Sequence, residues 1–280
     1  MAFALKFALI IIALLALLVV TQDAQIFPVA VTSLIKQKGK RHSPLPKDIK
    51  SVFLESGDSK IEIWKFSPSS SKSRKIAILI HGNGDTVDTF YHVQEMFASI
   101  GISSYSFDFK GYGHSSGWPS EWGVYEDSEA VLEYVTKEEG ISPEDLVIVG
   151  YSLGSSAAAR LAQKYGANTL ILYAPFTSLK DVVRDRPFLR ILKPFVRYEF
   201  PTIRYVSGLT KTRLIIAHGE KDTVVPFHHS LDLVRSYKGE TIHTVYLPNA
   251  DHLTIITESW NDVKKSLKEG TPKSVQRPTS

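Results

Sequence analysis

The sequence of 280 residues contains no cysteine. Without thiols the chain can hold no disulfide, no thiolate zinc site and no cysteine nucleophile, so covalent catalysis would need another side chain. The chain also lacks a large excess of positive or negative charge, since its formal net charge is only +4. Nucleic-acid binding needs a denser basic face with a recognisable module, and the sequence shows neither, which excludes nucleic acid as a partner. Internal repeats are absent too, and the length allows one large α/β domain or two small ones.

One long hydrophobic run stands at the N-terminus, "MAFALKFALIIIALLALLVV", and Lys6 is its single charge. Roughly 20 apolar residues suit a membrane-spanning helix. Cleavage of a signal peptide requires small residues at both the −3 and −1 positions, but Gln22 precedes Ala24 and Pro28 precedes Ala30. We therefore predict an uncleaved, single-pass anchor in an endomembrane or the plasma membrane, with secretion after signal cleavage as the alternative.

The segment after the anchor is basic and carries prolines, which is typical of a linker. Its cations at residues 36–41 outnumber Lys6, and the positive-inside rule then favours a cytoplasmic position for the globular part. The sequence predicts four segments: an anchor at residues 1–24, a linker at 25–49, an α/β domain at 50–268 and a disordered polar tail at 269–280.

Patterns typical of strands and helices alternate from residue 51 onward. Residues 51–66 indicate a hairpin around a Ser-Gly-Asp turn. The expected later strands are short apolar runs at residues 75–80, 102–107, 146–149, 169–173, 213–217 and 241–247. The expected helices lie at residues 86–99, 124–137, 155–162, 225–237 and 252–267. This alternation predicts an α/β fold with a mostly parallel central sheet and helices on both faces.

Residues 175–212 interrupt the alternation between two expected strands. An insertion of this length inside a compact fold is typical of a lid or binding element, so we predict a short cap. Within residues 180–204, seven basic residues stand against three acidic ones, with aromatic residues interleaved. One interpretation is a solvated face over a small apolar seam. The other is a cap that meets an anionic membrane surface or a substrate phosphate.

The stretch "LVIVGYSLGSSAAARLA" at residues 146–162 joins an apolar, β-branched run to a helix of small residues. Gly150 and Gly154 flank Ser152, and glycine lets a strand and a helix come close without Cβ clashes. A residue at such a sharp turn is held in a strained backbone conformation, with its side chain projecting above the sheet. The pattern G-x-S-x-G between a strand and a helix therefore predicts a nucleophile elbow with Ser152 as the nucleophile.

A serine nucleophile needs an acid and a base, and in this kind of fold they follow it in that order. Asp222 lies in the loop after the expected strand at residues 213–217, where an acid would orient the base. Glu220 in the same loop is the rival, although the Asp-Thr-Val-Val-Pro sequence at Asp222 resembles the usual acid loop more closely. Of nine histidines, His252 follows the last expected strand, so we predict it as the base.

Two backbone N–H groups are expected to stabilise the oxyanion of such a reaction. One belongs to Leu153 at the start of the helix after Ser152, where the helix dipole helps. The other belongs to Asn83 in the loop "HGNGDT", whose glycines let the backbone approach an acyl group. This set of residues requires no metal and no organic cofactor.

From about residue 50 to 268 the chain resembles the serine α/β-hydrolase superfamily, and within it the membrane-associated monoacylglycerol and lysophospholipid lipases of the alpha/beta-hydrolase-domain group. The stretches that carry the resemblance are "HGNG", "FDFKGYGHSSGWPSE", "GYSLGSS", "APFTSL" and "DTVVPF". The elbow is common to the whole superfamily. The Gly-Tyr-Gly-His-Ser loop, the Ala-Pro-Phe-Thr-Ser turn and the anchor are the features that indicate the alpha/beta-hydrolase-domain group within it. Few residues separate the anchor from the hairpin, so a headgroup preference is not carried over.

The residues and the resemblance together predict a serine hydrolase of carboxylic esters, with a monoacylglycerol or lysophospholipid substrate held near a bilayer. Ser152, rather than an aspartate, at the turn disfavours the chemistry of dehalogenases and epoxide hydrolases. The alternatives are a general carboxylesterase, a protein thioesterase, a peptidase, and a non-catalytic, membrane-tethered interaction protein. No pattern in the sequence indicates the oligomeric state.

Overall fold

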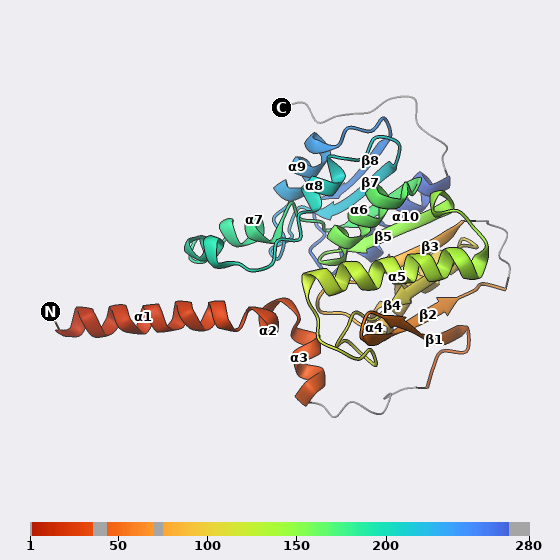
Figure 1. Cartoon of the computed structure of the whole chain (residues 1–280). Coiled ribbons are helices and arrows are strands. Elements are labelled where there is room, and N and C mark those ends of the chain that lie inside the picture. Colours follow the sequence, from red (N-terminus) through yellow and green to blue (C-terminus); the bar gives the residue numbers. More distant parts are fainter. Residues whose placement is uncertain (1, 36–43, 70–74, 269–280) are drawn as a thin grey trace.

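A single eight-stranded sheet forms the centre of the protein (Figure 1). The computed structural model describes residues 2–35, 44–69 and 75–268, so the predicted tail at residues 269–280 and the basic linker residues 36–43 lie outside the described residues. The strand order is β1-β2-β4-β3-β5-β6-β7-β8. Strand β2 is antiparallel to both of its neighbours, and all other pairs are parallel. This confirms the predicted α/β fold with a mostly parallel sheet.

The strands coincide closely with the short apolar runs of the sequence. Their bounds are Ile49–Ser56 (β1), Ser59–Phe66 (β2), Ile76–Ile80 (β3), Ser103–Phe107 (β4), Leu146–Tyr151 (β5), Thr169–Tyr173 (β6), Arg213–Gly219 (β7) and Ile242–Leu247 (β8). The larger helices between them are Val87–Ala98 (α4), Glu121–Glu139 (α5), Gly154–Tyr165 (α6), His228–Ser236 (α9) and Ile255–Lys268 (α10), with a short 3-10 turn at Pro143–Asp145 (η1).

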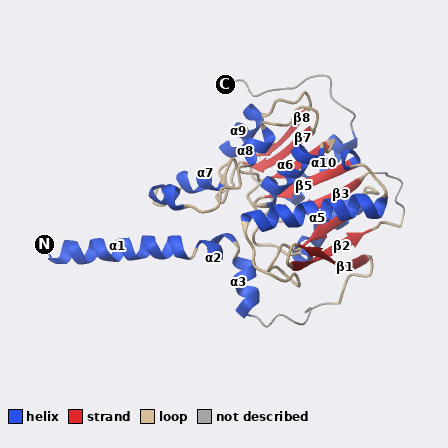
Figure 2. Cartoon of the chain, viewed as in Figure 1, coloured by secondary structure: helices blue, strands red, loops and turns tan. Residues whose placement is uncertain are grey.

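Helices cover both faces of the sheet, which explains why central strands such as β3 and β5 are apolar on both faces (Figure 2). On β3, for example, Ile78 and Ile80 point into the layer that contains α5 and α6. The alternate residues Ala77 and Leu79 point into the layer that contains α4 and α10. Because both faces are buried, the carboxyl ends of the strands are where loops can form a site.

The last helix begins later than predicted. The sequence pattern placed His252 at its start, whereas α10 begins at Ile255. The carboxylate of Asp251 accepts the backbone N–H groups of Leu253 and Thr254, both at 2.9 Å, and so holds these residues in a turn. His252 therefore lies on a loop rather than on a helix.

The segment predicted as an anchor and linker contains three helices: α1 (Ala2–Val20), α2 (Gln22–Ile26) and α3 (Pro28–Ile35). Phe27, expected in the linker, is fully buried, and its ring lies 5.4 Å from that of Tyr198 and 6.4 Å from that of Phe200. Ala30 is buried in the same layer. These apolar contacts pack the region around Phe27 onto the domain, so the linker is not extended there.

Helix α1 projects away from the sheet (Figure 1). Apart from Lys6, the large side chains that it exposes are apolar and include Leu5, Phe7, Leu14 and Leu17. Among the described residues, no helix reaches the length and hydropathy that a membrane span requires. The predicted single-pass anchor therefore stays a prediction.

The insertion at residues 175–212 contains short helices: α7 (Leu179–Arg184), a 3-10 helix η2 (Arg190–Phe195) and α8 (Thr202–Val206). The carboxylate of Glu121, at the start of α5, accepts the backbone N–H groups of Glu199 at 2.6 Å and Phe200 at 2.7 Å. These bonds hold Phe200 in a left-handed backbone conformation with φ of 44°. The returning arm of the insertion is thus fixed to the domain.

Replacing Phe27 with alanine is expected to lower the free energy of unfolding by about 3–5 kcal/mol, because deleting a fully buried ring leaves a cavity. The matched control is Phe53→Ala, since Phe53 is 57% exposed on β1 and its loss should change stability by only about 0.5 kcal/mol. Urea unfolding of the full chain in detergent measures both. Equal, small changes would show that Phe27 does not join the N-terminal segment to the domain.

Candidate active site

Ser152 lies at a sharp turn between β5 and α6. A Cβ on Gly154 would lie 2.3 Å from the carbonyl oxygen of Ile80, and one on Gly150 would lie 2.7 Å from atoms of α6, so both positions require glycine. The turn gives Ser152 a φ of 49°, which non-glycine residues rarely adopt. Its N–H donates to the carbonyl of Tyr173 on β6 at 2.9 Å. This backbone strain is what the predicted elbow requires.

The structure brings Ser152, His252 and Asp222 together in one hydrogen-bonded series. The Nε2 atom of His252 lies 3.0 Å from the Oγ of Ser152, and its Nδ1 lies 2.7 Å from the Oδ2 of Asp222. All three residues are buried. The rival acid Glu220 is exposed. Since a carboxylate can only accept, the proton on Nδ1 faces Asp222 and the lone pair on Nε2 faces the serine hydroxyl.

A second histidine, His218 at the end of β7, also contacts the carboxylate. Its Nε2 lies 3.2 Å from the Oδ2 of Asp222 and 3.0 Å from the carbonyl of Val225. A carbonyl accepts only, so Nε2 carries the proton, and Nδ1 accepts from the hydroxyl of Ser230 at 2.6 Å. His218 is fully buried. Sequence reasoning missed this residue, because a lone histidine in an apolar strand carries no motif.

The carboxylate of Asp222 is held in its charged form. Burial alone would raise its pKa, but the hydrogen bonds from His218 and His252 and the N–H of Val225 together hold the pKa of Asp222 well below its usual range. Its Oδ1 accepts the N–H groups of Val224 at 2.8 Å and Val225 at 2.7 Å. An ionised, fully bonded carboxylate can orient His252 and stabilise its imidazolium form.

Tyr151, the residue before the serine, also positions His252. Its hydroxyl donates to the carbonyl of His252 at 3.0 Å, and the two rings lie 5.3 Å apart. Burial raises the pKa of this phenol, which keeps it a donor at neutral pH. The loop that carries His252 is therefore held by the same turn that carries Ser152.

The two backbone groups predicted for the oxyanion lie in the expected loops. Leu153 is buried at the start of α6, and Asn83 is half-buried in the loop after β3, where its carbonyl accepts the hydroxyl of Tyr112 at 3.0 Å. Within the described part of the chain, the N–H groups of Asn83 and Leu153 donate to no protein acceptor. Both donors are thus available to a ligand, and their role as an oxyanion hole stays a prediction.

Asp185, His228 and His229 form a separate cluster between the cap and α9, with potential ligand atoms within 4.8 Å of one another. Burial lowers the pKa of His229 to about 4, so the ring is neutral. Its Nδ1 accepts the N–H of Thr177 at 3.2 Å, which places the ring proton on Nε2, facing the Oδ2 of Asp185 at 3.2 Å. A protonated Nε2 cannot bind a metal, so this cluster fits a contact between the cap and α9 better than a metal site.

The strand order, the turn at Ser152, and the loops that carry Asp222 and His252 together define the class of α/β-hydrolases. Residues 71–213 match the family model Hydrolase_4, described as serine aminopeptidase, S33. The chain belongs to this family, which confirms the resemblance seen in the sequence motifs.

Curated relatives of the chain include alpha/beta hydrolase domain-containing protein 17B of Homo sapiens, 33% identical over 171 residues, covering 60% of this chain and 57% of that protein. Another is lysophosphatidylserine lipase ABHD12 of Gallus gallus, 29% identical over 192 residues, covering 60% of this chain and 49% of that protein. The chain thus spans about half the length of the curated relatives it matches.

Solved structures share the fold at low sequence identity. An alpha-beta hydrolase from Vibrio vulnificus has a TM-score of 0.69 at 17% identity, covering 87% of this chain and 91% of that one. The esterase Pf2001 of Pyrococcus furiosus has a TM-score of 0.66 at 20% identity, covering 82% of this chain and 94% of that one. At these identities the likeness shows the fold alone.

His218→Phe is expected to lower kcat/KM for a soluble ester by about 10- to 100-fold, because it removes a hydrogen bond to a buried charge. Asp222 has a depressed pKa, so its ionised form is lost as pH falls through that pKa. Without His218 the depression is weaker, and the loss of activity on acidification should begin at a higher pH.

His218→Gln is the matched control, because its amide nitrogen can donate to Asp222 in place of Nε2. Values of kcat/KM measured from acid to neutral pH should be intermediate for His218→Gln, between those of the wild type and those of His218→Phe. An unchanged rate and pH profile in His218→Phe would show that His218 does not act on Asp222.

Proposed function

We propose that the protein is a serine hydrolase that cleaves carboxylic esters, with a monoacylglycerol or a lysophospholipid at a membrane as its substrate. One observation carries the proposal: the series from Asp222 through His252 to Ser152, with distances of 2.7 and 3.0 Å, ending at a serine on a strained turn. The fold, the family and this geometry all point to the same chemistry.

The proposed reaction begins when the Nε2 of His252 takes the proton of Ser152 and the Oγ attacks the ester carbonyl carbon. The N–H groups of Asn83 and Leu153 bind the oxyanion, and Asp222 stabilises the imidazolium. His252 then gives its proton to the leaving alcohol, and an acyl-serine remains. Water, deprotonated by His252, attacks this acyl group, and the serine recovers its proton as the carboxylic acid leaves.

Ser152→Ala is expected to lower kcat for p-nitrophenyl butyrate by at least about 10⁴-fold, because no other described side chain can replace the nucleophile in the series. Ser155→Ala is the matched control: Ser155 is buried on α6, the helix that follows the turn, and its hydroxyl donates to the carbonyl of Gly150 rather than to His252. Full activity in Ser152→Ala, with the protein folded as judged by circular dichroism, would contradict the mechanism.

Membrane attachment is the second part of the proposal. Helix α1 presents apolar side chains to solvent, and the cap beside it exposes Phe188, Ile191 and Phe195. Figure 1 shows α1 and the α7 region extending from the same side of the sheet, and α1 contacts η2. Exposed apolar patches of this kind are typical of membrane-binding surfaces.

A lipid ester fits this surface better than a water-soluble one. The cap carries seven basic residues against three acidic ones within residues 180–204, and arginine pairs well with phosphate. A relative from Gallus gallus bears the name lysophosphatidylserine lipase, which supports a substrate with one acyl chain and an anionic headgroup.

The full chain is expected to hydrolyse lysophosphatidylserine or a monoacylglycerol faster than p-nitrophenyl butyrate, and vesicles that contain anionic lipid should raise the rate. A cap variant with serine at positions 188, 191 and 195 should lose the response to vesicles and keep its rate on the soluble ester. If the wild type cleaves soluble esters far faster than any lipid, and vesicles make no difference, the lipid substrate is wrong.

The description of the family model favours a second candidate, an aminopeptidase. Such an enzyme must bind a cationic amino terminus, which the basic cap disfavours. Aminoacyl p-nitroanilides in the same substrate panel separate the two candidates, because faster release from them than from the esters would favour the peptidase.

A further inference from the structure

Two side chains of α2 tie the N-terminal segment to the cap. Gln22 is buried, accepts the N–H of Arg197 at 2.9 Å and donates to the carbonyl of Phe195 at 2.9 Å. Asp23 accepts the hydroxyl of Tyr198 at 2.7 Å and a guanidinium N–H of Arg197 at 2.9 Å. A side-chain amide that pairs with two main-chain groups and a carboxylate that pairs with two donors fix the two segments against each other.

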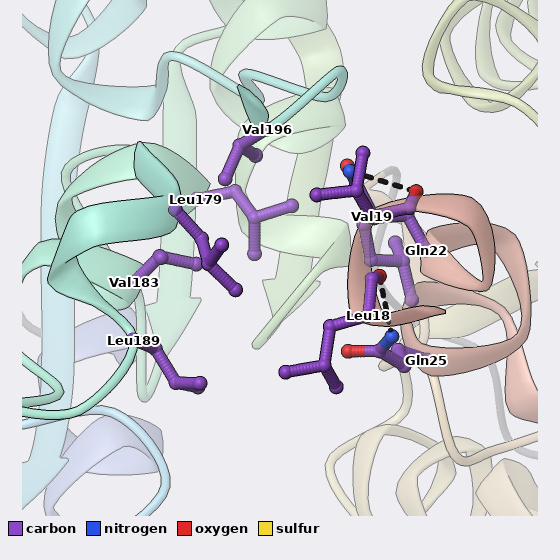
Figure 3. Close-up of a pocket in the computed structure, with 10 residues that line it drawn as sticks. Leu18, Val19, Gln22, Gln25, Leu179, Val183, Leu189 and Val196 are labelled. Carbon is purple, nitrogen blue, oxygen red and sulfur yellow. Dashed lines mark hydrogen bonds between the residues drawn. The ribbon is translucent and has the colours of Figure 1, made fainter. Parts of the chain in front are cut away.

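An apolar pocket lies between these two segments (Figure 3). It is partly open to solvent. Leu18 and Val19 face Leu179 and Val183 across it, and Leu192 also lines the cap side.

The pocket offers a ligand no free charge. Its only polar lining residues within the described chain are Gln22 and Gln25, and their amide nitrogens already donate to main-chain carbonyls. A phosphate would be desolvated there without a donor to bind it, and a cationic amino terminus without a charge of opposite sign. An alkyl chain loses no hydrogen bond on entering and removes apolar surface from water.

The cap wall of the pocket is joined to the candidate active site on two sides. Leu179 begins α7 shortly after Tyr173, whose carbonyl accepts the N–H of Ser152. After α7, the guanidinium of Arg186 donates to the carbonyl of Thr223 at 2.7 Å and to that of Val224 at 2.8 Å, next to Asp222. The opposite wall belongs to the end of α1, the helix proposed above to meet the membrane. One wall of the pocket therefore belongs to the proposed membrane surface, and the other is connected to the loops of the candidate active site.

We propose that α1, α2 and the cap jointly form the binding site for the alkyl chain of a single-chain lipid ester. This proposal rests on the proposed function and adds to it that the N-terminal helix is one wall of the substrate site. Lipid chains would enter from the α1 side, and the hydrogen bonds of Gln22 and Asp23 would keep the two walls at the spacing that admits one chain.

Filling the pocket from either wall should remove the preference for long chains. The variants Val19→Trp and Leu192→Trp place an indole in it. Their matched controls, Ala24→Trp and Pro187→Trp, change exposed residues of the same two segments that neither line the pocket nor belong to the proposed membrane surface. The assay is kcat/KM of the full chain in detergent for p-nitrophenyl butyrate and p-nitrophenyl palmitate. Displacing only two methylenes of the alkyl chain from the pocket would weaken its binding about tenfold.

We expect both filling variants to lose at least about tenfold on the palmitate ester and to stay near wild type on the butyrate ester, while both controls behave as wild type. An unchanged ratio of palmitate to butyrate rates in both filling variants would overturn the pocket proposal and leave the proposed function intact. If the wild type cleaves neither ester, the proposed function fails, and the pocket proposal fails with it.

Photocrosslinking tests the same site in the unmodified protein. A palmitate analogue with a diazirine at the end of its chain should crosslink to residues 18–26 or 179–196, as mapped by peptide mass spectrometry, and excess palmitate should compete. Competed crosslinks found only outside these two segments would overturn the proposal, whether or not the tryptophan variants fold.

Discussion

The close crossing of helix α6 over the end of strand β3 is the constraint on which the rest of the site depends. The carbonyl oxygen of Ile80 lies where a Cβ on Gly154 would be only 2.3 Å away, so the helix can begin there only with glycine. This crossing leaves no room for a gradual turn, and Ser152 adopts a left-handed conformation that costs about 1–3 kcal/mol. The apolar layers on both faces of the sheet stabilise the two elements that impose this strain.

Once the serine is fixed, its partners need only reach the same edge of the sheet. Strands β5, β7 and β8 are parallel, so the loops at their carboxyl ends meet there. At this edge, hydrogen bonds fix the orientation of each of these polar side chains. The carbonyl of Val225 sets the tautomer of His218, Asp222 accepts from both histidines, and the lone pair of His252 is left facing Ser152. Because all acceptor positions of the buried Asp222 carboxylate are bonded, burying its charge costs little, and the carboxylate orients the ring of His252.

The sequence predicted what local patterns encode. Strand positions, the turn at Ser152 and the loops that carry Asp222 and His252 follow from short runs and fixed spacings. The missed features depend on contacts between distant residues: Gln22 bonds to the carbonyl of a residue 173 positions away, and Phe27 packs against the same arm of the cap. His218 was missed for the same reason. Its contacts are with Asp222 and Ser230, which its neighbours in the sequence do not indicate.

The central claim is that the strained turn and the hydrogen-bonded series make Ser152 the one activated serine of the chain. Reaction of the full chain with a fluorophosphonate, followed by intact-mass and peptide mass spectrometry, tests it directly. We expect a single adduct, located on Ser152. No adduct, or an adduct on another residue while Ser152 stays unmodified, would contradict the claim.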